Sequence, residues 1–597
     1  MALALNCILS LALGLLLPSL WGGALTERPL LRALAALACF AAMTIARRPG
    51  GTDRRMRRLA SVPGLLFACF TAWGAALEAL GAVPWKSPLY HLAALLLIPA
   101  WTAALCALWT LLAKIERRAP SSRRGTGLFR RPALTALLLL LCWTPCFLAI
   151  FPGNFVYDTG GEYDQCAFGF NSAFPRLHSW LNINVIHGVY GFTHSFTAGV
   201  AVFTLLHMLG LALLFAWMLK NLRAFGLRPW LLWLCFAWCA LFPTVQMLSV
   251  SPIRDLMFSG FLTATVFYLL LMLRDSKRFW KSGAPLGFGL CLALTVLSRE
   301  NNGGLLSAGV LVAVTAAAAL SAKKGERRGA AVFAAASLAC FFGLSAFLGA
   351  VCRPFERVHT VSGLAALTQP LARSYERDEW SDYEKRLFAE YFDVDNLRYV
   401  PNDADPSTAA LKGLRGEGSG LGGFVRLWIG AFRRHPGSFL DAWLENTRGL
   451  WQPNAVIDGY VRSGRYEGLE TAYFYYTDQI TGPGSLRILL PRVHDYYENI
   501  GTRLSFERIP VLRLPFSIGF HFWLLLGGLF YWAWRGKRRL LWVFAPLAAY
   551  TLLSALCPLM LVRYFAALFL CFPLLLCALL QPGRMLEEEW ETWEDRT

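Results

Sequence analysis

The sequence predicts an all-α polytopic membrane protein with about 14 transmembrane helices. Three observations support this fold class. Hydrophobic residues make up 56% of the 597-residue chain and charged residues only 16%, a balance that is too apolar for a soluble protein. Apolar runs of about 17–25 residues, long enough to cross a bilayer, recur along the chain. Lysine and arginine gather in alternate loops between these runs, as expected for a multi-pass membrane protein.

Fourteen apolar runs are candidate spans. They fall at residues 3–22, 30–46, 60–83, 89–113, 132–152, 196–218, 229–247, 255–273, 283–297, 304–321, 329–351, 516–534, 540–556 and 565–580. We divide the chain accordingly into five parts. They are a four-span N-terminal extension (1–131), a membrane core with its first outer loop at 153–195 (132–351), a hydrophilic domain (352–515), three C-terminal spans (516–580) and an acidic tail (581–597).

The distribution of basic residues predicts the orientation of the chain. If the N-terminus lies in the cytoplasm, the six cytoplasmic loops carry 28 lysines and arginines, whereas the short loops on the other side carry seven. The positive-inside rule therefore favours this orientation. The even number of spans returns the C-terminal tail to the cytoplasm. The formal charge of +19 follows from this topology, so we expect a lipid bilayer and no nucleic acid as a partner.

The long hydrophilic region lies between the eleventh and twelfth spans, which places it outside the cytoplasm. Its basic and acidic residues nearly cancel, at 20 and 21 in residues 353–515. We expect a folded domain of mixed or mainly helical structure. Apolar residues at helical spacing follow Pro436, and proline is favoured in the first turn of a helix. This helix is predicted to pack within the domain, and lying on the membrane surface is the alternative.

Acidic residues follow the fifth span, in a stretch that contains several helix-breaking prolines and glycines. Charged groups at membrane depth are costly, which makes them default candidates for function. Asp158 is the candidate catalytic base or ligand, and a helix cap or salt bridge is the alternative. Glu162 and Asp164 are additional acids. Thr159 and Glu162 fit a capping box, which would give Glu162 a structural role.

Basic and aromatic residues at the predicted outer ends of other spans complete the candidate site. His178 is a candidate catalytic residue in the first outer loop. Arg254 begins the eighth span, where an ion pair with the adjacent Asp255 is the alternative to a binding role. Arg299 follows the ninth span, and Arg563 with Tyr564 precedes the last. A guanidinium can bind a phosphate through two parallel hydrogen bonds, and anchoring to lipid headgroups is the alternative.

One histidine lies within a predicted span rather than at its end. His207 is placed inside the sixth span, and we expect it to be a hydrogen-bonded packing residue.

These features resemble the GT-C superfamily of integral-membrane glycosyltransferases, in particular the bacterial branch related to protein mannosyltransferases and aminoarabinose transferases. The resemblance covers roughly residues 132–580. It rests on Phe151-Pro-Gly with Asp158, on Phe174-Pro-Arg-Leu-His178 and on Arg563-Tyr564, in a chain with many spans and a large outer domain.

The resemblance implies a function and its partners. It implies transfer of a sugar from a polyprenyl-phosphate donor to a glycan, lipid or protein acceptor of the cell envelope, with inversion at the anomeric carbon, in the inner or plasma membrane of a bacterium. Asp158 would deprotonate or orient the acceptor hydroxyl, and Arg563 or Arg299 would stabilise the departing phosphate. Thr159 follows Asp158 where many relatives have a second acid, so a divalent cation is left open and no cofactor is assigned.

Two other classes of membrane protein share part of this pattern. An O-antigen ligase or polymerase would also combine many spans with a large outer loop, but would use the histidines and arginines of that loop. A lipid or polysaccharide transporter would line a route through the bundle with ionisable residues. The sequence shows no paired broken helices, which argues against a transporter.

Overall fold

In the computed structural model, the described residues are 53–117, 126–155, 157–166, 170–171, 175–320, 324–352, 354–356, 364–414, 420–453, 483–501, 513–557 and 559–586. Nearly all regular structure in these ranges is helical, which confirms the predicted all-α class. Two very short strands, β1 (Phe170–Asn171) and β2 (Pro354–Glu356), pair in parallel.

Seven helices of the described residues are long and apolar enough to cross a membrane. They are α4 (Arg54–Leu80), α6 (Ile98–Arg117), α7 (Pro132–Ala149), α10 (Phe196–Ala224), α13 (Arg254–Arg274), α17 (Lys324–Val351) and α27 (Arg538–Leu553) with its extension η5 (Ser554–Leu556). The number rises to as many as nine if two bent helix pairs each count as one span. These helices indicate a membrane-spanning protein.

Three further apolar helical segments are shorter, namely α15 (Ala284–Ser298), the part Gly303–Ala319 of α16 (Glu300–Ala319), and α26 (Ile518–Trp534). The predicted spans at 3–22 and 30–46 lie outside the described residues. Each of the other twelve predicted spans falls on one of these apolar helices or bent pairs. The total of 14 spans therefore stays a prediction, as do the orientation of the chain and the identity of the membrane.

The remaining helices are shorter connecting or domain elements. Those of the bundle are α5 (Pro88–Leu96), η1 (Gly127–Arg130), α8 (Tyr157–Cys166), α9 (Arg176–Thr193), α14 (Ser276–Lys281), α25 (Pro491–Gly501), η4 (Leu514–Phe516) and α30 (Pro582–Leu586). Those of the hydrophilic region are α18 (Ala365–Arg377), α19 (Asp382–Tyr391), α20 (Asp405–Ala409), α21 (Gly420–Arg434), α22 (Pro436–Asn446) and α23 (Arg448–Trp451).

Two bent helix pairs correct the expectation that the chain has no paired broken helices. The first joins α11 (Pro229–Leu241) to α12 (Pro243–Ser249) at 53°, and the second joins the segment of η6 (Val562–Phe565) and α28 (Ala566–Leu570) to α29 (Phe572–Leu580) at 43°. A proline opens the second helix of each pair, at Pro243 and Pro573. Proline lacks the backbone N–H that a continuous helix would use, so the bend falls at this point.

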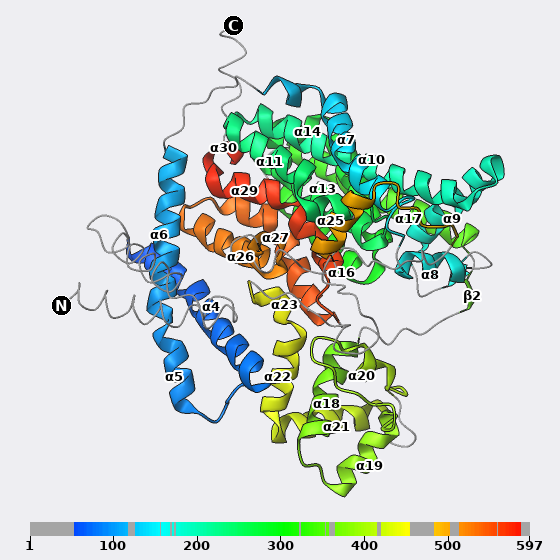
Figure 1. The fold of residues 1–597 in the computed structure, drawn as a ribbon. Helices are drawn as coiled ribbons and strands as arrows, with labels where there is room; N and C mark the ends of the chain where they lie inside the picture. The colour runs from blue at the N-terminus through cyan, green and yellow to red at the C-terminus, as the bar shows by residue number, and fades with distance from the viewer. Residues whose placement is uncertain are drawn as a thin grey trace.

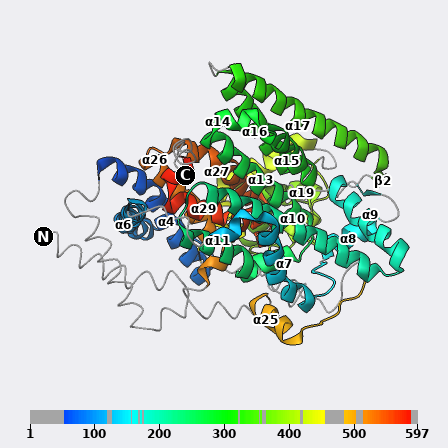
Figure 2. The same ribbon diagram turned by 90° about the horizontal axis from the view of Figure 1, so that it is seen from above.

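Helix α13 occupies the middle of the bundle in both views of the fold (Figures 1 and 2). It packs against α10, α15, α27 and α28. Its first residues, Arg254 and Asp255, therefore lie near the ends of these neighbouring helices. This position of α13 allows residues that are distant in the sequence to meet at one site.

Helices α18–α22 gather around an apolar core of their own, below the bundle in Figure 1. The helix predicted at Pro436 is present as α22, with proline in its first turn. Phe439 on this helix belongs to the domain core, which agrees with the expectation that the helix packs within the domain.

A cluster of buried charges connects this domain to the loop between α4 and α5. The Arg373 side chain is only 2% exposed, and it pairs with Asp441 at 3.1 Å and with Glu445 at 2.7 Å. Arg373 also donates to the backbone oxygen of Gly81 at 2.8 Å, and Asp441 accepts from the Trp85 indole at 2.9 Å. The domain is thus held to the end of α4 by hydrogen bonds that are shielded from solvent.

Candidate active site

The loop after the fifth predicted span is fastened to the segment that precedes α13. Helix α7 ends at Ala149. The Asn154 backbone N–H then donates to the Val250 oxygen at 2.8 Å, and its side-chain amide donates to the Ser251 hydroxyl at 2.8 Å. These bonds place the start of α8 beside the start of α13. Asp158 is the second residue of α8, and its side chain lies outside the described part of the chain.

Glu162 on α8 and two residues on α9 form a buried polar cluster. The Glu162 carboxylate accepts a hydrogen bond from the Ser179 hydroxyl at 2.5 Å and lies 2.7 Å from Nδ1 of His178. The side chains of Glu162 and His178 are 1% and 2% exposed. A carboxylate so deeply buried is stable only with such partners. The cluster therefore fixes the packing of α8 against α9.

The capping-box interpretation of Thr159 and Glu162 is wrong. Helix α8 begins at Tyr157, so Thr159 lies inside the helix rather than at its N-cap. The Glu162 carboxylate reaches α9 instead of turning back to the start of its own helix. The sequence spacing of a capping box is local, and it carries no information about a partner 16 or 17 residues away.

The second ring nitrogen of His178 extends the cluster to α13. Nε2 lies 3.2 Å from the backbone oxygen of Pro252. A carboxylate and a carbonyl oxygen are both acceptors. The His178 ring therefore links Glu162 on α8 to Pro252, two residues before α13 begins.

Asp255, the second residue of α13, holds Arg299. The Arg299 guanidinium lies 3.0 Å from the Asp255 carboxylate and donates to the Tyr550 hydroxyl at 2.9 Å. Tyr550 in turn donates to the backbone oxygen of Tyr564 at 2.7 Å. The Arg299 side chain is 20% exposed and that of Asp255 only 3%. Arg299 is thus anchored from the inside while part of its side chain stays accessible.

Arg563 approaches the same tyrosine as Arg299. The Cζ atoms of Arg299 and Arg563 lie 5.2 Å and 5.1 Å from the centre of the Tyr564 ring. Arg563 also donates to the Tyr564 hydroxyl at 3.4 Å. Two guanidiniums therefore share one aromatic ring, an arrangement that cation–π attraction favours. The structure thus brings two cations from distant parts of the chain to one place.

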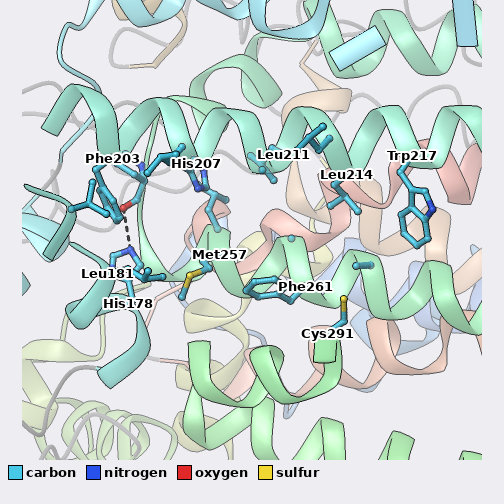
Figure 3. A pocket seen from close by; sticks show the side chains of 18 of the residues that line it. His178, Leu181, Phe203, His207, Leu211, Leu214, Trp217, Met257, Phe261 and Cys291 are labelled. Atoms are coloured by element: carbon cyan, nitrogen blue, oxygen red, sulfur yellow. Dashed lines mark hydrogen bonds between the residues drawn. The ribbon is translucent and has the colours of Figure 1, made fainter. Parts of the chain in front are cut away.

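An apolar cavity of about 450 Å³ begins at His178 and runs between α9, α10, α13 and α15. Figure 3 shows His178 and His207 at one end of the row of lining residues and Trp217 with Cys291 at the other. Leu206 and Leu213 line the cavity and are each 50% exposed. Since both also belong to the outside of α10, the cavity opens towards the surroundings of the bundle.

The structure brings together most of the candidate residues predicted from the sequence. Glu162 contacts His178, which in turn contacts Pro252 before α13. Arg254 is the half-buried first residue of that helix. Asp164 is exposed on α8, and the loss of part of its hydration raises the pKa of its carboxyl above the ordinary value. The roles of Asp158, His178, Arg254, Arg299, Arg563 and Tyr564 stay predictions.

Sequence reasoning misses Ser179, Tyr550 and Asn154. Tyr550 lies in an apolar run, where a tyrosine gives no sign that its hydroxyl joins two loops. The sequence suggests the adjacent Arg254 as the partner of Asp255, whereas the structure pairs Asp255 with Arg299, 44 positions away. The signal available in the sequence is the position of each residue at the end of a span, because ends on the same side of a membrane lie near one another.

One group of residues in the described part of the chain has the composition of a cation site. His494, Asp495 and Glu498 on α25 can each offer a ligand atom, and these atoms lie within 4.8 Å of one another. The group lies on a helix that packs against α7 and α12 rather than on α8, α9 or α13. The divalent cation left open by the sequence therefore stays a prediction.

No family model matches the chain, and neither a curated protein nor a solved structure matches it. The resemblance to the GT-C superfamily consequently stays a prediction from the residues that carry it.

Proposed function

We propose that this protein is a membrane glycosyltransferase of the GT-C type, which moves a sugar from a polyprenyl-phosphate donor to an acceptor outside the cytoplasm. The observation that carries the proposal is the pair Arg299 and Arg563, whose guanidiniums contact one tyrosine ring. Two guanidiniums that converge at a partly exposed position suit a phosphate, which each can bind through parallel hydrogen bonds.

The proposed reaction is a direct displacement at the anomeric carbon. The acceptor oxygen forms a bond to that carbon while the bond from the carbon to the phosphate oxygen breaks. The acceptor proton passes to Asp158, and the phosphate leaves with the electron pair. Arg299 and Arg563 stabilise the charge that develops on the phosphate, which is the step where fixed cations contribute most. The apolar cavity that begins at His178 offers room for hydrocarbon, and Leu256, the residue after Asp255, lines it.

The Glu162–His178 pair has a positioning role in this proposal. Its contact with the Pro252 oxygen holds the segment that leads into α13, and Asp255 orients Arg299 from the first turn of that helix. A change in Glu162 would therefore act on the reaction through the placement of Arg299.

The experiment is sugar transfer by the purified full chain in nanodiscs, with a labelled polyprenyl-phosphate sugar and envelope lipids as acceptors. We expect Asp158→Asn and Arg563→Gln each to lower turnover by at least about a hundredfold. Arg426→Gln, at an exposed arginine of α21, is the matched control and should leave turnover unchanged. The proposal is wrong if both site variants transfer sugar at the wild-type rate.

A transporter is the second candidate, because broken helices often form the substrate sites of transporters and two bent pairs are present. Their surroundings favour the enzyme. Trp238 stacks on Phe242 and packs against Phe572, and its indole donates to the Phe569 oxygen at 3.1 Å. Aromatic rings thus cover the bends instead of a polar route. Uptake of the labelled donor into sealed vesicles without any sugar transfer would favour the transporter.

The ligase or polymerase alternative depends on histidines and arginines of the large hydrophilic region. Part of that region, residues 454–482, lies outside the described residues. The same assay separates this alternative from the proposed enzyme, because a ligase or polymerase would not depend on Asp158.

A further inference from the structure

One side chain of the hydrophilic domain contacts the loop that connects α27 to Arg563. Asn446 is the last residue of α22, and its side-chain amide donates to the backbone oxygen of Cys557 at 3.0 Å. Cys557 follows η5 directly, at the end of the helical segment that α27 begins. The hydrogen bond therefore joins the hydrophilic domain to the end of an apolar helix of the bundle.

Cys557 lies beside the guanidinium of Arg299. The Cys557 thiol has a hydrogen bond with the Arg299 side chain. Tyr550, on α27, accepts from the same guanidinium at 2.9 Å and donates to the backbone oxygen of Tyr564 at 2.7 Å. The loop that Asn446 contacts thus supplies one of the partners of Arg299 and leads directly to Arg563.

Packing alone does not explain an amide at position 446. Asn446 is 5% exposed, and its side-chain oxygen is buried without a hydrogen-bond partner among the described residues. A buried polar atom without a partner lowers the stability of a protein, whereas an apolar side chain of similar shape avoids this loss. The nitrogen that donates to Cys557 is the part of Asn446 that a leucine of similar size cannot replace.

Helix α22 is itself firmly held within the domain. Asp441 and Glu445 on this helix pair with the buried Arg373, and Glu445 directly precedes Asn446. A side chain on a fixed helix can hold a loop in one position, because its own geometry is supported by the surrounding contacts. The buried charges around Arg373 therefore support the hydrogen bond to Cys557 from behind.

We propose that Asn446 is a positioning residue, which holds the loop at Cys557 and thereby keeps Arg299 and Arg563 in place around the phosphate. A fixed cation stabilises transition-state charge only where it is correctly placed. The hydrophilic domain thus takes part in assembling the site. The effect on sugar transfer rests on the proposed function, whereas the hold on the loop does not.

The first measurement follows the loop and needs no sugar donor. The full chain in nanodiscs is treated with N-ethylmaleimide, and the rate of alkylation at the half-buried Cys557 is read from peptide masses. Asn446→Leu removes the hydrogen bond, so we expect this rate to rise about threefold to tenfold, the effect of one net hydrogen bond. Asn446→Ala, which cannot clash with its neighbours, should raise the rate as well.

The matched control is Asn396→Leu, at an exposed asparagine of the same domain whose amide donates to Asp393. It should leave the alkylation rate of Cys557 unchanged. Cys69, a half-buried cysteine on α4, is the internal reference and should react at the wild-type rate in every variant.

The second measurement is sugar transfer by the same variants. We expect Asn446→Leu to lower kcat about tenfold and to change the KM of the donor by less than about threefold, because Arg299 shifts without being removed. The unfolding temperature should change little, since the variant loses a hydrogen bond and an unsatisfied buried oxygen together. A purely structural role would lower the unfolding temperature without this separation of kcat from KM.

Three results have distinct meanings. Unchanged alkylation of Cys557 in both Asn446 variants would overturn the proposal. Faster alkylation with a wild-type kcat would show that Asn446 holds the loop without positioning the arginines, which also overturns it. A wild type that transfers no sugar would instead contradict the proposed function, and the alkylation rates would still decide whether Asn446 holds the loop.

Discussion

Two regions of this protein hold an arginine among acidic and tyrosine side chains, and they differ in composition and exposure. In the domain below the bundle, Arg373 is 2% exposed and has two carboxylates, Asp441 and Glu445, for its one positive charge. In the bundle, Arg299 is 20% exposed, pairs with Asp255 and faces the same tyrosine ring as a second guanidinium, that of Arg563.

The difference separates a structural cluster from the proposed phosphate-binding site. At Arg373 two carboxylates surround one cation in a closed environment, and burial raises the pKa of Asp441 although the hydrogen bond from Val83 and the charge of Arg373 oppose this shift. At Arg299 two cations lie close to one tyrosine ring, and part of the Arg299 side chain is accessible. A closed cluster with its partners in place holds two parts of a protein together, whereas an open pair of guanidiniums can take an anion.

The largest effect is expected at the closed cluster. Arg373→Met would leave the Asp441 and Glu445 carboxylates buried without their cation, a change that typically costs about 3–5 kcal/mol. We expect a large fall in the thermal unfolding temperature of the detergent-purified protein, with early proteolysis of the domain. Arg377→Met, which removes an exposed arginine that also donates to Gly81, is the control. Equal unfolding temperatures for the two variants would contradict a structural role for Arg373.

The next largest effect is expected at Arg299, and it tests the contrast with Arg373. Arg299→Met should lower sugar transfer by about a hundredfold to a thousandfold, the typical effect of removing one group that stabilises transition-state charge. It should also lower stability, because Asp255 is left without its partner. The double variant Arg299→Met/Asp255→Asn should regain stability but not turnover. Recovery of both stability and turnover would mean that Arg299 has only a structural role, as Arg373 does.

The sequence predicts the position of these groups better than their partners. Span ends are recognisable from apolar runs, so His178, Arg299 and Arg563 can be assigned to one end of the bundle from the sequence alone. Pairings such as Glu162 with His178 depend on how α8 lies against α9, which no local pattern encodes. The bends at Pro243 and Pro573 escape prediction because each proline lies within a continuous apolar run, where hydropathy alone shows a single span.

A moderate effect is expected at the pair that holds the start of α13. Glu162→Gln keeps the shape of the side chain and an oxygen that can accept from Ser179, but its amide nitrogen cannot accept a hydrogen bond from His178. We expect a fall in turnover of about tenfold, with a smaller change in the donor's KM, since Arg299 shifts without being removed. Ser179→Ala, which deletes only the other hydrogen bond of Glu162, is the control. Wild-type turnover in Glu162→Gln would show that the Glu162–His178 pair only packs α8 against α9.

The smallest effect is expected at Tyr550, whose hydroxyl joins Arg299 to the segment that carries Arg563. Tyr550→Phe removes the hydrogen bond from Arg299 and the one to the Tyr564 oxygen, while the ring still fills its buried position. Each bond contributes about 0.5–1.5 kcal/mol, so we expect a modest fall in unfolding temperature and a fall in turnover of no more than about tenfold. Tyr531→Phe, on the neighbouring α26, removes a similarly buried hydroxyl and should change stability alone. If both variants leave turnover unchanged, Arg299 and Arg563 do not act as a coupled pair. The cluster around Arg299 and the cluster around Arg373 then differ in their exposure to solvent and not in their role.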